Sequence, residues 1–313
     1  MKLTHPSTRA FIDEARRLKG FSLFDLLHGY FYARWTYFYI AMGTGRHRWA
    51  KKLAPLVSRV TAVISKNAGP QAGGFEDTYH AKVVTLSAAR QLISIQEDIR
   101  LPDLEKVVPY TQARDIIIKN PDHIAVLDCP CRASRENPCL PLDVCLIVGE
   151  PFASFVVEHN PQRARRITHA EADAILREED RRGHVHHAFF KDAMLGRFYA
   201  ICNCCACCCG AMQAQRGGTP MLASSGFVAE VDGQACLGCR KCEKACPFDA
   251  IHIEGERKSA RPVIDPERCM GCGICAGQCK PGALHLARME SKGMPLEIET
   301  LLEDAIRAQN TRG

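Results

Sequence analysis

The sequence lacks the signatures of several common classes of protein. Its first 128 residues contain no cysteine, so no disulfide framework extends along the chain of 313 residues. No apolar run stands before a small-residue cleavage site after Met1, and we therefore expect no signal peptide and a reducing, cytoplasmic location. The stretch Gly43-Thr-Gly45 matches neither a phosphate-binding loop nor a dinucleotide fingerprint, and we expect no nucleotide, flavin or nicotinamide site.

A strong charge bias and a long uncharged apolar run are also missing. The 41 basic and 35 acidic residues leave a net charge of only +6. No basic run is interleaved with base-reading or stacking motifs, so we expect no nucleic-acid partner. The most apolar stretch, residues 21–39, is interrupted by Asp25, His28 and Arg34, whereas a membrane-spanning helix needs roughly 20 residues with few or no charges.

Residues 21–39 hold nine of the 22 aromatic residues and have basic residues on both sides. Three hypotheses fit this pattern. The segment could be a packed helix of the body, a surface that docks on a partner subunit, or an amphipathic helix that lies on a membrane surface. In the last case residues 21–52 would make the contact, and the protein would be peripheral to the inner face of the membrane.

Cysteine is the residue that the chain has in excess. All 18 cysteines lie between Cys129 and Cys279, and clustered cysteines in a reducing compartment bind metal more often than each other. We predict an α+β protein in which a mixed α/β, Cys-rich region precedes a pseudo-twofold domain. The predicted parts are a helical, aromatic-rich segment (1–65), an α/β Cys-rich domain (66–216), a two-cluster domain (226–290) and a C-terminal helix (291–313).

The last Cys-rich part contains an internal repeat of 33 residues with the spacing C-x2-C-x2-C-x3-C in each copy. The first three cysteines of a copy can wrap one face of a [4Fe-4S] cube, and the fourth points away toward the other cube. The spacing therefore predicts two ligand sets: Cys236, Cys239, Cys242 and Cys279 for one cluster, and Cys269, Cys272, Cys275 and Cys246 for the other. Zinc is the alternative, although zinc prefers two C-x2-C pairs for each ion.

Residues 226–290 resemble the bacterial two-[4Fe-4S] ferredoxin family. The resemblance implies a small fold with two hairpins and two helices, and an activity of one-electron transfer. Gly238 and Gly271 are expected to let the backbone turn close to the inorganic core. One position departs from the family, because Lys280 follows Cys279 and the proline is displaced to Pro281.

Ten further cysteines lie upstream, around a predicted helix that begins with a capping box of Thr168 and Glu171 and ends at Gly183. A predicted strand, Ile124 to Leu127, leads into the first group. The first group is Cys129, Cys131, Cys139 and Cys145. The second group is Cys202, Cys204, Cys205, Cys207, Cys208 and Cys209.

We expect the upstream cysteines to hold one or two further iron–sulfur clusters, either cubes or non-cubane clusters; structural zinc and redox-active free thiols are the alternatives. Cys208-Cys209-Gly210 resembles the CCG signature of heterodisulfide-reductase-type subunits. Residues 110–290 resemble iron–sulfur proteins that place a similar Cys-rich run before a ferredoxin domain. His184, His186 and His187 are expected to face solvent or cap the helix, with metal ligation or proton transfer as the alternative.

Three functions fit these patterns. The favoured hypothesis is an iron–sulfur electron-transfer protein, a ferredoxin-type relay of single electrons to or from a partner oxidoreductase. The second is an oxidoreductase, or a subunit of one, whose upstream cysteines form the reactive site for an acceptor such as a disulfide or a thioester. The third is a structural or regulatory protein whose clusters sense redox state. The sequence leaves open whether the protein is an enzyme.

Overall fold

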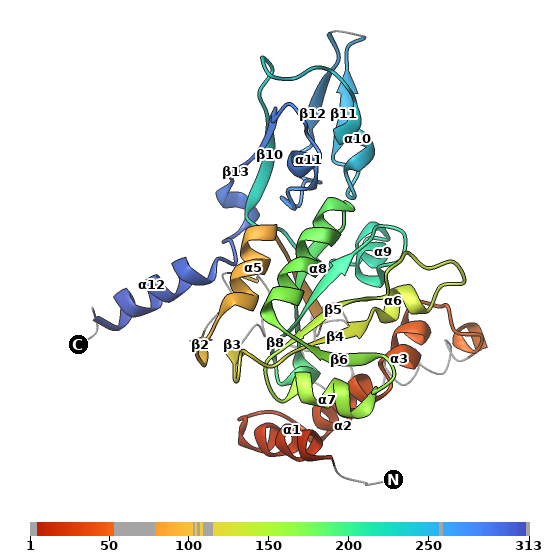
Figure 1. The fold of residues 1–313 in the computed structure, drawn as a ribbon, viewed down its shortest axis with the longest axis vertical. Helices are drawn as coiled ribbons and strands as arrows, with labels where there is room; N and C mark the ends of the chain where they lie inside the picture. The colour runs from red at the N-terminus through yellow and green to blue at the C-terminus, as the bar shows by residue number, and fades with distance from the viewer. Residues whose placement is uncertain are drawn as a thin grey trace.

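The structure is a computed structural model that describes residues 5–52, 79–102, 104, 107–108, 115–256 and 259–310. Three helices open the described chain: α1 (Pro6–Arg17), α2 (Leu23–Arg34) and α3 (Thr36–Gly43). They pack at one end of the molecule (Figure 1). A capping box formed by Ser22 and Asp25 starts α2, because each satisfies a free backbone N–H of the other residue. The predicted boundary between residues 65 and 66 lies outside the described residues.

Within the described residues, a nine-stranded mixed sheet forms the body of the protein, and seven of its strands follow the order β6-β4-β5-β8-β7-β1-β9. Beyond this path β2 pairs with β3, and β3 pairs with β8. The strands are β1 (Tyr79–Val84), β2 (Ile99–Pro102), β3 (Asp115–Ile118), β4 (Ile124–Asp128), β5 (Asp143–Val148), β6 (Ala164–Ile167), β7 (Val185–Lys191), β8 (Arg197–Cys204) and β9 (Leu222–Ala223). The predicted strand before Cys129 is confirmed as β4.

Helices cover both faces of the sheet, which is why every residue of β7 is buried. One face packs against α1, α2 and α7 (Phe152–His159), and the other packs against α5 (Leu86–Ser94) and α8 (His169–Arg181). Successive strand residues point to opposite faces, so Phe189 joins the first core and Phe190 the second. Shorter elements of the body are α6 (Pro130–Ala133), η3 (Asp192–Met194) and α9 (Gly210–Arg216).

Helix α8 confirms the predicted helix but only half of its predicted cap. The Thr168 hydroxyl accepts a hydrogen bond from the Glu171 backbone N–H at 3.2 Å. The Glu171 carboxylate does not complete the box; it pairs with Arg165 of the neighbouring β6. A tertiary ion pair has therefore replaced a local hydrogen bond.

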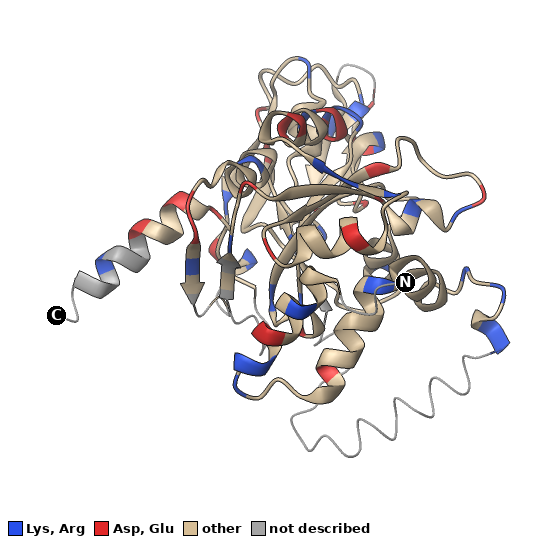
Figure 2. Cartoon of the chain, turned by 60° about the horizontal axis from the view of Figure 1, so that its bottom comes forward, with Lys and Arg blue, Asp and Glu red and all other residues tan. Residues whose placement is uncertain are grey.

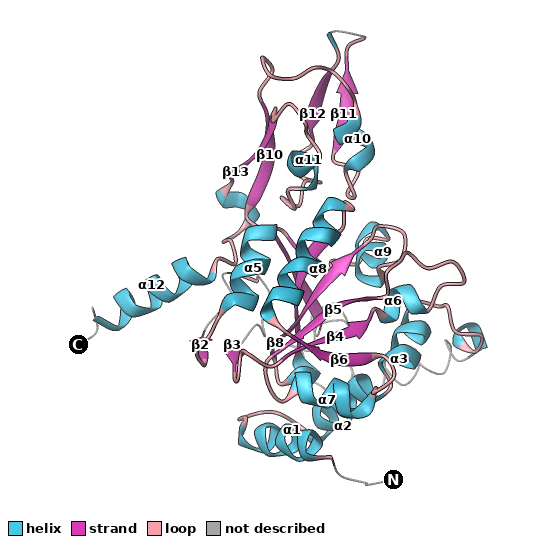
Figure 3. Cartoon of the chain, in the orientation of Figure 1, coloured by secondary structure: helices cyan, strands magenta, loops and turns pink. Residues whose placement is uncertain are grey.

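The C-terminal part carries two small antiparallel sheets and two short helices (Figure 3). Its elements are β10 (Phe227–Val231), α10 (Lys241–Ala245), β11 (Ile251–Glu254), β12 (Arg261–Ile264), α11 (Ile274–Gly277) and β13 (Leu284–Arg288). β10 pairs with β13, and β11 pairs with β12. Each small sheet therefore joins a strand of one sequence copy to a strand of the other copy.

The backbone repeats as well as the sequence. Gly238 and Gly271, which occupy equivalent positions of the two copies, have φ values of +65° and +64°, so the expected need for glycine is confirmed. A Cβ atom at Gly271 would lie 2.2 Å from the Phe227 carbonyl oxygen. Asp249 and Gly282 form a second equivalent pair with positive φ, at +52° and +68°.

The chain ends in η5 (Glu290–Lys292) and α12 (Ile298–Asn310), which extends away from the body (Figure 1). The start of α12 is anchored, because the Ile298 N–H donates to the Gln91 side chain of α5 at 3.2 Å. Basic and acidic side chains are distributed over both the N-terminal helices and the C-terminal part (Figure 2). Within the described ranges, every helix is too short or too polar to cross a membrane.

Candidate metal centres

Two small cavities of about 20 Å³ each lie in the C-terminal part, and each has four thiols in its wall. The first wall contains Cys236, Cys239, Cys242 and Cys279, together with Ile253 and Leu284. The second contains Cys246, Cys269, Cys272 and Cys275, together with Ile251 and Leu286. Each cavity thus combines three thiols of one sequence copy with one thiol of the other, and apolar side chains keep water away.

The chemistry of these walls fits a cationic, thiophilic metal core. Burial raises the pKa of Cys242 and Cys246, and it raises the pKa of Cys275 to about 12. Thiolates in so dry a place need a positive charge beside them, which a metal supplies. The Ala250 N–H donates a hydrogen bond to the Cys246 sulfur at 3.3 Å, as expected for a sulfur that carries negative charge.

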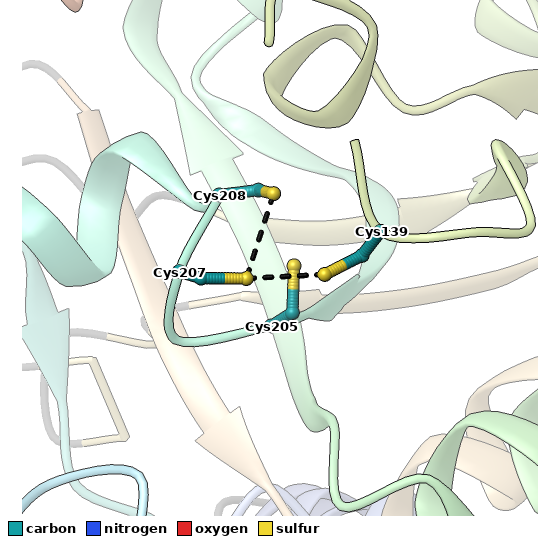
Figure 4. A group of neighbouring side chains, drawn as sticks. All are labelled: Cys139, Cys205, Cys207 and Cys208. Carbon is teal, nitrogen blue, oxygen red and sulfur yellow. Dashed lines mark hydrogen bonds between the residues drawn. The ribbon is translucent and has the colours of Figure 1, made fainter. Parts of the chain in front are cut away.

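Four upstream cysteines form a compact group, here called the cysteine quartet (Figure 4). Their sulfur atoms all lie within 4.8 Å of one another: Cys139, Cys205, Cys207 and Cys208. The Cys139 sulfur lies 3.1 Å from the Cys207 sulfur, which lies 3.6 Å from the Cys208 sulfur. Cys207 is exposed whereas Cys205 and Cys208 are buried, so the quartet sits at the protein surface. Four converging soft ligands can hold a metal ion or a metal cluster.

The other six upstream cysteines form a closed circuit, here called the cysteine ring. Each thiol lies beside two others of the set that shift its pKa, in the order Cys129, Cys131, Cys209, Cys204, Cys202, Cys145 and back to Cys129. The Cys145 and Cys202 sulfurs are 3.7 Å apart. All six are buried or partly buried.

The order of strands in the sheet explains the ring. Cys145 on β5 is the register partner of Cys202 on β8, so these side chains lie side by side on one face. Cys204 follows Cys202 by two residues and therefore points to the same face. Cys129 directly follows β4, the other neighbour of β5, and thus reaches the same place.

The thiols of the ring differ in pKa. Hydrogen bonds from Cys145 and Cys204 lower the pKa of Cys202 to about 6, and those from Cys131 and Cys204 hold the pKa of Cys209 well below its usual range. The hydrogen bond with Cys131 is the main cause that raises the pKa of Cys129 to about 12. These shifts favour negative charge at Cys202 and Cys209 over the other thiols of the ring, and a bound cation would favour ionisation of the remaining thiols.

The structure groups the upstream cysteines differently from the sequence-based grouping. The sequence separated Cys129, Cys131, Cys139 and Cys145 from the later run. The fold instead moves Cys139 into the quartet and places the other three members in the ring. Cys139 differs because it lies in the loop between α6 and β5, outside the sheet that aligns the ring.

Two arginines hold the cysteine loops in place. Arg132, fully buried, donates to the carbonyl oxygens of Pro141 at 2.6 Å and Asn203 at 3.0 Å, and forms an ion pair with buried Glu179. Burial raises the pKa of the Cys205 thiol, and the positive charge of Arg132 opposes that rise. Arg46 contacts both the loop that contains Cys131 and the loop that contains Cys208.

Arg46 donates to the carbonyl oxygens of Cys131 at 2.9 Å and Cys208 at 2.8 Å. It therefore ties the ring, the quartet and the segment after α3 together. A Cβ atom on Gly210 would lie 2.7 Å from a methyl group of Thr44, which shows how closely that segment covers the cysteine loop. The segment that follows α3 is thus part of the upstream centre, a role that its sequence does not reveal.

The expectation that the three histidines face solvent or cap a helix is wrong for His186 and His187, which are 1% and 0% exposed on β7. They are buried because both faces of this strand are covered. His186 Nδ1 lies 2.6 Å from the Asn203 side-chain oxygen. His184 lies 2.7 Å from Glu179 and 3.0 Å from Arg132, within the same polar network.

A further cavity, of about 340 Å³, lies between α2, α3 and the sheet, and the cysteine ring forms part of its wall. Its polar lining residues include Tyr32, Tyr39, Lys191 and Tyr199. The sequence marked Tyr32 and Tyr39 only as members of the aromatic segment 21–39, and it did not single out Lys191 or Tyr199. The Tyr32 and Tyr199 hydroxyls are 2.8 Å apart although 167 positions separate them in the chain. No local pattern could have joined residues so distant in sequence.

The comparison with protein-family models matches residues 235–283 to the 4Fe-4S dicluster domain. The match covers both copies of the cysteine repeat and implies a role in electron transfer. No curated protein matches the chain. Residues 235–283 are therefore assigned to this domain, and the cysteine quartet is a separate candidate metal site upstream.

Proposed function

Because residues 235–283 form a 4Fe-4S dicluster domain, we propose that this protein is an iron–sulfur electron-transfer protein that relays single electrons to or from a partner oxidoreductase. The thiols that line each small cavity are the proposed ligands: Cys236, Cys239, Cys242 and Cys279 for one [4Fe-4S] cluster, and Cys246, Cys269, Cys272 and Cys275 for the other. When bound, such clusters supply reversible one-electron chemistry at potentials tuned by hydrogen bonds and burial.

The main observation that supports the proposed electron relay is the contact between the dicluster domain and the loop of the upstream cysteines. Arg216 donates to the Ala206 carbonyl oxygen at 3.0 Å and to the Pro247 carbonyl oxygen at 2.7 Å. Ala206 stands between two quartet cysteines, and Pro247 follows Cys246. One guanidinium thus bridges the two Cys-rich regions.

Apolar packing reinforces this bridge. Phe248 and Met270, which line the second small cavity, pack against the core that contains Cys204 and Cys209. The Ser225 N–H donates to the Met270 carbonyl oxygen at 3.1 Å. The thiols of the second cavity therefore lie on the side of the dicluster domain that faces the body, which supports a route between the two regions.

We propose that the quartet and the ring hold the one or two further iron–sulfur clusters. Ten thiols divided as four and six suit two separate centres, and positive charge from Arg132 and Arg46 offsets the negative charge of thiolates. The opening of the ring onto a large cavity favours a second function, an oxidoreductase whose upstream cysteines form the reactive site.

The test is the iron and acid-labile sulfide content of anaerobically purified protein, with EPR of the reduced state. Two [4Fe-4S] clusters alone account for about eight iron atoms, and upstream clusters raise the count above that value. Cys205→Ser should lower the iron content while leaving the dicluster EPR signals unchanged. Cys272→Ser should remove a dicluster signal. If Cys272→Ser kept all the dicluster EPR signals, the proposed relay would be contradicted.

We propose that the aromatic segment of residues 21–39 docks on the redox partner, with contact of residues 21–52 to a membrane surface as the alternative. Leu23, Phe24 and Leu27 of α2 are 70%, 54% and 60% exposed, which is unusual for large apolar side chains on one helix. If the redox partner contacts only these apolar side chains, reversing the charge of the neighbouring basic residues should leave the binding of the partner unchanged. Binding of the protein to anionic phosphatidylserine vesicles, abolished by Phe24→Ser and Leu27→Ser together, would identify a membrane surface instead of a protein partner.

A further inference from the structure

The four sulfur atoms of the cysteine quartet are close enough together to bind one metal ion. The Cys207 sulfur lies 3.1 Å from that of Cys139 and 3.6 Å from that of Cys208, and no pair of the four is more than 4.8 Å apart. Four sulfur atoms in a tetrahedron around one ion, with metal–sulfur bonds of about 2.3 Å, lie about 3.8 Å from one another. The observed distances fall on both sides of this value.

An iron–sulfur cluster needs a wider arrangement of its ligands. In a [4Fe-4S] cube each thiolate binds a different iron atom, so the thiolates stand farther apart than they do around one ion. Among the residues that the structure describes, no other group of three or more Cys, His, Asp or Glu lies as close together as the quartet. The thiols of each dicluster cavity are therefore spaced more widely, and the quartet differs from them in the kind of centre that it fits.

Two separate loops supply the four thiols. The first loop turns sharply over residues 206–208, because the Cys208 N–H donates to the Cys205 carbonyl oxygen at 3.3 Å and the Cys209 N–H donates to the same oxygen at 3.1 Å. Cys139 approaches from the loop between α6 and β5 (Figure 4). The two loops together form a closed set of four sulfur ligands, which is what a tetrahedral ion requires.

Positive charge surrounds the loop that carries three of the four ligands. Three arginines donate hydrogen bonds to successive carbonyl oxygens of this loop: Arg216 to Ala206 at 3.0 Å, Arg135 to Cys207, and Arg46 to Cys208 at 2.8 Å. Four thiolates around one iron ion carry a net negative charge, which grows by one when the ion is reduced. The guanidinium groups therefore stabilise the bound thiolates and the reduced state of such an ion.

The position of the quartet favours iron over zinc as its metal. Arg216, which contacts the quartet loop, also donates to the Pro247 carbonyl oxygen at 2.7 Å, and Pro247 follows the dicluster thiol of Cys246. On the other side, Cys207 is exposed at the protein surface. A centre between a cluster and the surface passes electrons only if its metal changes oxidation state, which iron does and zinc does not.

We propose that the cysteine quartet binds a single iron ion through four thiolates, without inorganic sulfide, and that this ion exchanges electrons with the dicluster domain. This inference rests on the proposed relay and narrows it, because it assigns one ion to the quartet and leaves any further cluster to the ring. In the step, a ferric ion takes one electron from a reduced [4Fe-4S] cluster and becomes ferrous. The four iron–thiolate bonds remain, and no proton is transferred.

The first test compares iron with acid-labile sulfide in anaerobically purified wild-type protein. Cubes contain equal numbers of both, so the ion should leave about one more iron atom than sulfide in each chain. Mössbauer spectroscopy should show one isolated high-spin iron ion, ferric after oxidation with ferricyanide and ferrous after reduction with dithionite. Equal amounts of iron and sulfide, or one zinc ion in place of the additional iron, would overturn the proposal.

The variants Cys207→Ser and Cys139→Ser locate the ion. Each should lose about one iron atom and no sulfide, whereas the loss of a cube would remove about four of each. Leu140→Ser is the matched control, because Leu140 follows Cys139 in the same loop, is 68% exposed and offers no thiol. It should keep the iron content of the wild type. Loss of sulfide together with iron in the two cysteine variants would show that the quartet holds a cluster.

Folding and the electron relay are checked separately from the identity of the ion. Circular dichroism and the dicluster EPR signals identify a variant that has not folded, and the iron-to-sulfide ratio and Mössbauer spectrum of the wild type then decide the question. A folded variant that loses sulfide overturns the single ion while leaving the relay intact. Absence of the dicluster signals from the wild type would instead contradict the relay itself.

Discussion

At the scale of single residues, the upstream centre depends on charges that are buried beside the cysteine loops. Arg132 and Glu179 are both 0% exposed and pair with each other inside the body. The pair is costly to break from one side, because the remaining charge is left buried without compensation. Its place between the ring and the quartet links the stability of the fold to the positions of the thiols.

Glu179→Ala is expected to lower the free energy of unfolding by about 3–5 kcal/mol, because it leaves Arg132 as an uncompensated buried charge. Urea denaturation under anaerobic conditions measures the change. Glu178→Ala is the matched control, since the adjacent Glu178 makes its ion pairs with Arg181 and Arg182 at the surface and should cost at most about 1 kcal/mol. Equal effects of the two variants would contradict the role of burial.

Burial also makes stability depend on pH through His187. Burial lowers the pKa of His187 to about 3, from an ordinary value of 6.5. Below pH 6.5 the His187 side chain therefore binds a proton in the unfolded chain but stays neutral in the folded protein. The free energy of unfolding thus falls as pH falls. The loss is about 1 kcal/mol for the first pH unit below 6.5, and it approaches about 1.4 kcal/mol per unit at lower pH.

The variant His187→Gln removes this titration. Its unfolding free energy, measured between pH 5 and pH 7, should fall less steeply with acid than that of the wild type. His28 and His159, whose pKa values burial lowers to about 4, remain and contribute a shared background slope in both proteins. An unchanged slope in His187→Gln would show that His187 is protonated in the folded state.

At the scale of elements, α2 closes the large cavity by direct contact with the turn η3. A Cβ atom built on Gly29 would lie 1.9 Å from the Ala193 carbonyl oxygen, so glycine is required there for the helix to approach. The turn directly follows Lys191 on β7. The position of the helix therefore determines the position of Tyr32 over the buried ammonium group.

Gly29→Ala should displace α2 from η3 and destabilise the protein by about 1–3 kcal/mol, because the added methyl group meets rigid backbone. Thermal unfolding followed by circular dichroism measures the loss. Gly43→Ala is the matched control, since nothing lies within 4 Å of the methyl group in α3. That variant should be neutral or slightly stabilising. Destabilisation by both variants would contradict the argument from close approach.

At the scale of the whole molecule, two Cys-rich regions meet at one joint. The dicluster domain contacts the body through α8 and α11, where the Gln278 side chain donates to the Arg181 carbonyl oxygen at 2.9 Å, and through the bridge made by Arg216. The joint brings thiols that are far apart in sequence into one continuous region. It makes the arrangement of the domains part of the proposed function.

Arg216→Ala should slow the exchange of electrons between the C-terminal and upstream centres by severalfold, because the bridge between Ala206 and Pro247 is lost. Rapid-mixing absorption spectroscopy of the reduction measures this rate. Arg240→Ala is the control, since Arg240 bonds only to Gly255 within the dicluster domain among its described partners. The iron content of both variants should match that of the wild type. Equal rates would show that the bridge serves stability alone.

The sequence by itself determined the features that depend on short stretches of chain. The cysteine spacing, the 33-residue repeat, the strand before Cys129 and the helix after Thr168 could all be predicted, because neighbouring residues define a loop, a turn or a helix cap. The need for glycine with positive φ at Gly238 and Gly271 could be predicted in the same way. Even there, the Glu171 half of the cap failed, because a tertiary ion pair took its carboxylate.

Only the tertiary structure decided how the upstream cysteines divide into a quartet and a ring, and that His186 and His187 are buried. Cys129, Cys145 and Cys202 meet because β4, β5 and β8 are neighbours in the sheet, and the order of strands is set by packing over the whole chain. The large cavity arises in the same way, since α2, β7 and β8 bring Tyr32, Lys191 and Tyr199 together. Local sequence carries the ligands, and long-range packing determines which ligands share a site.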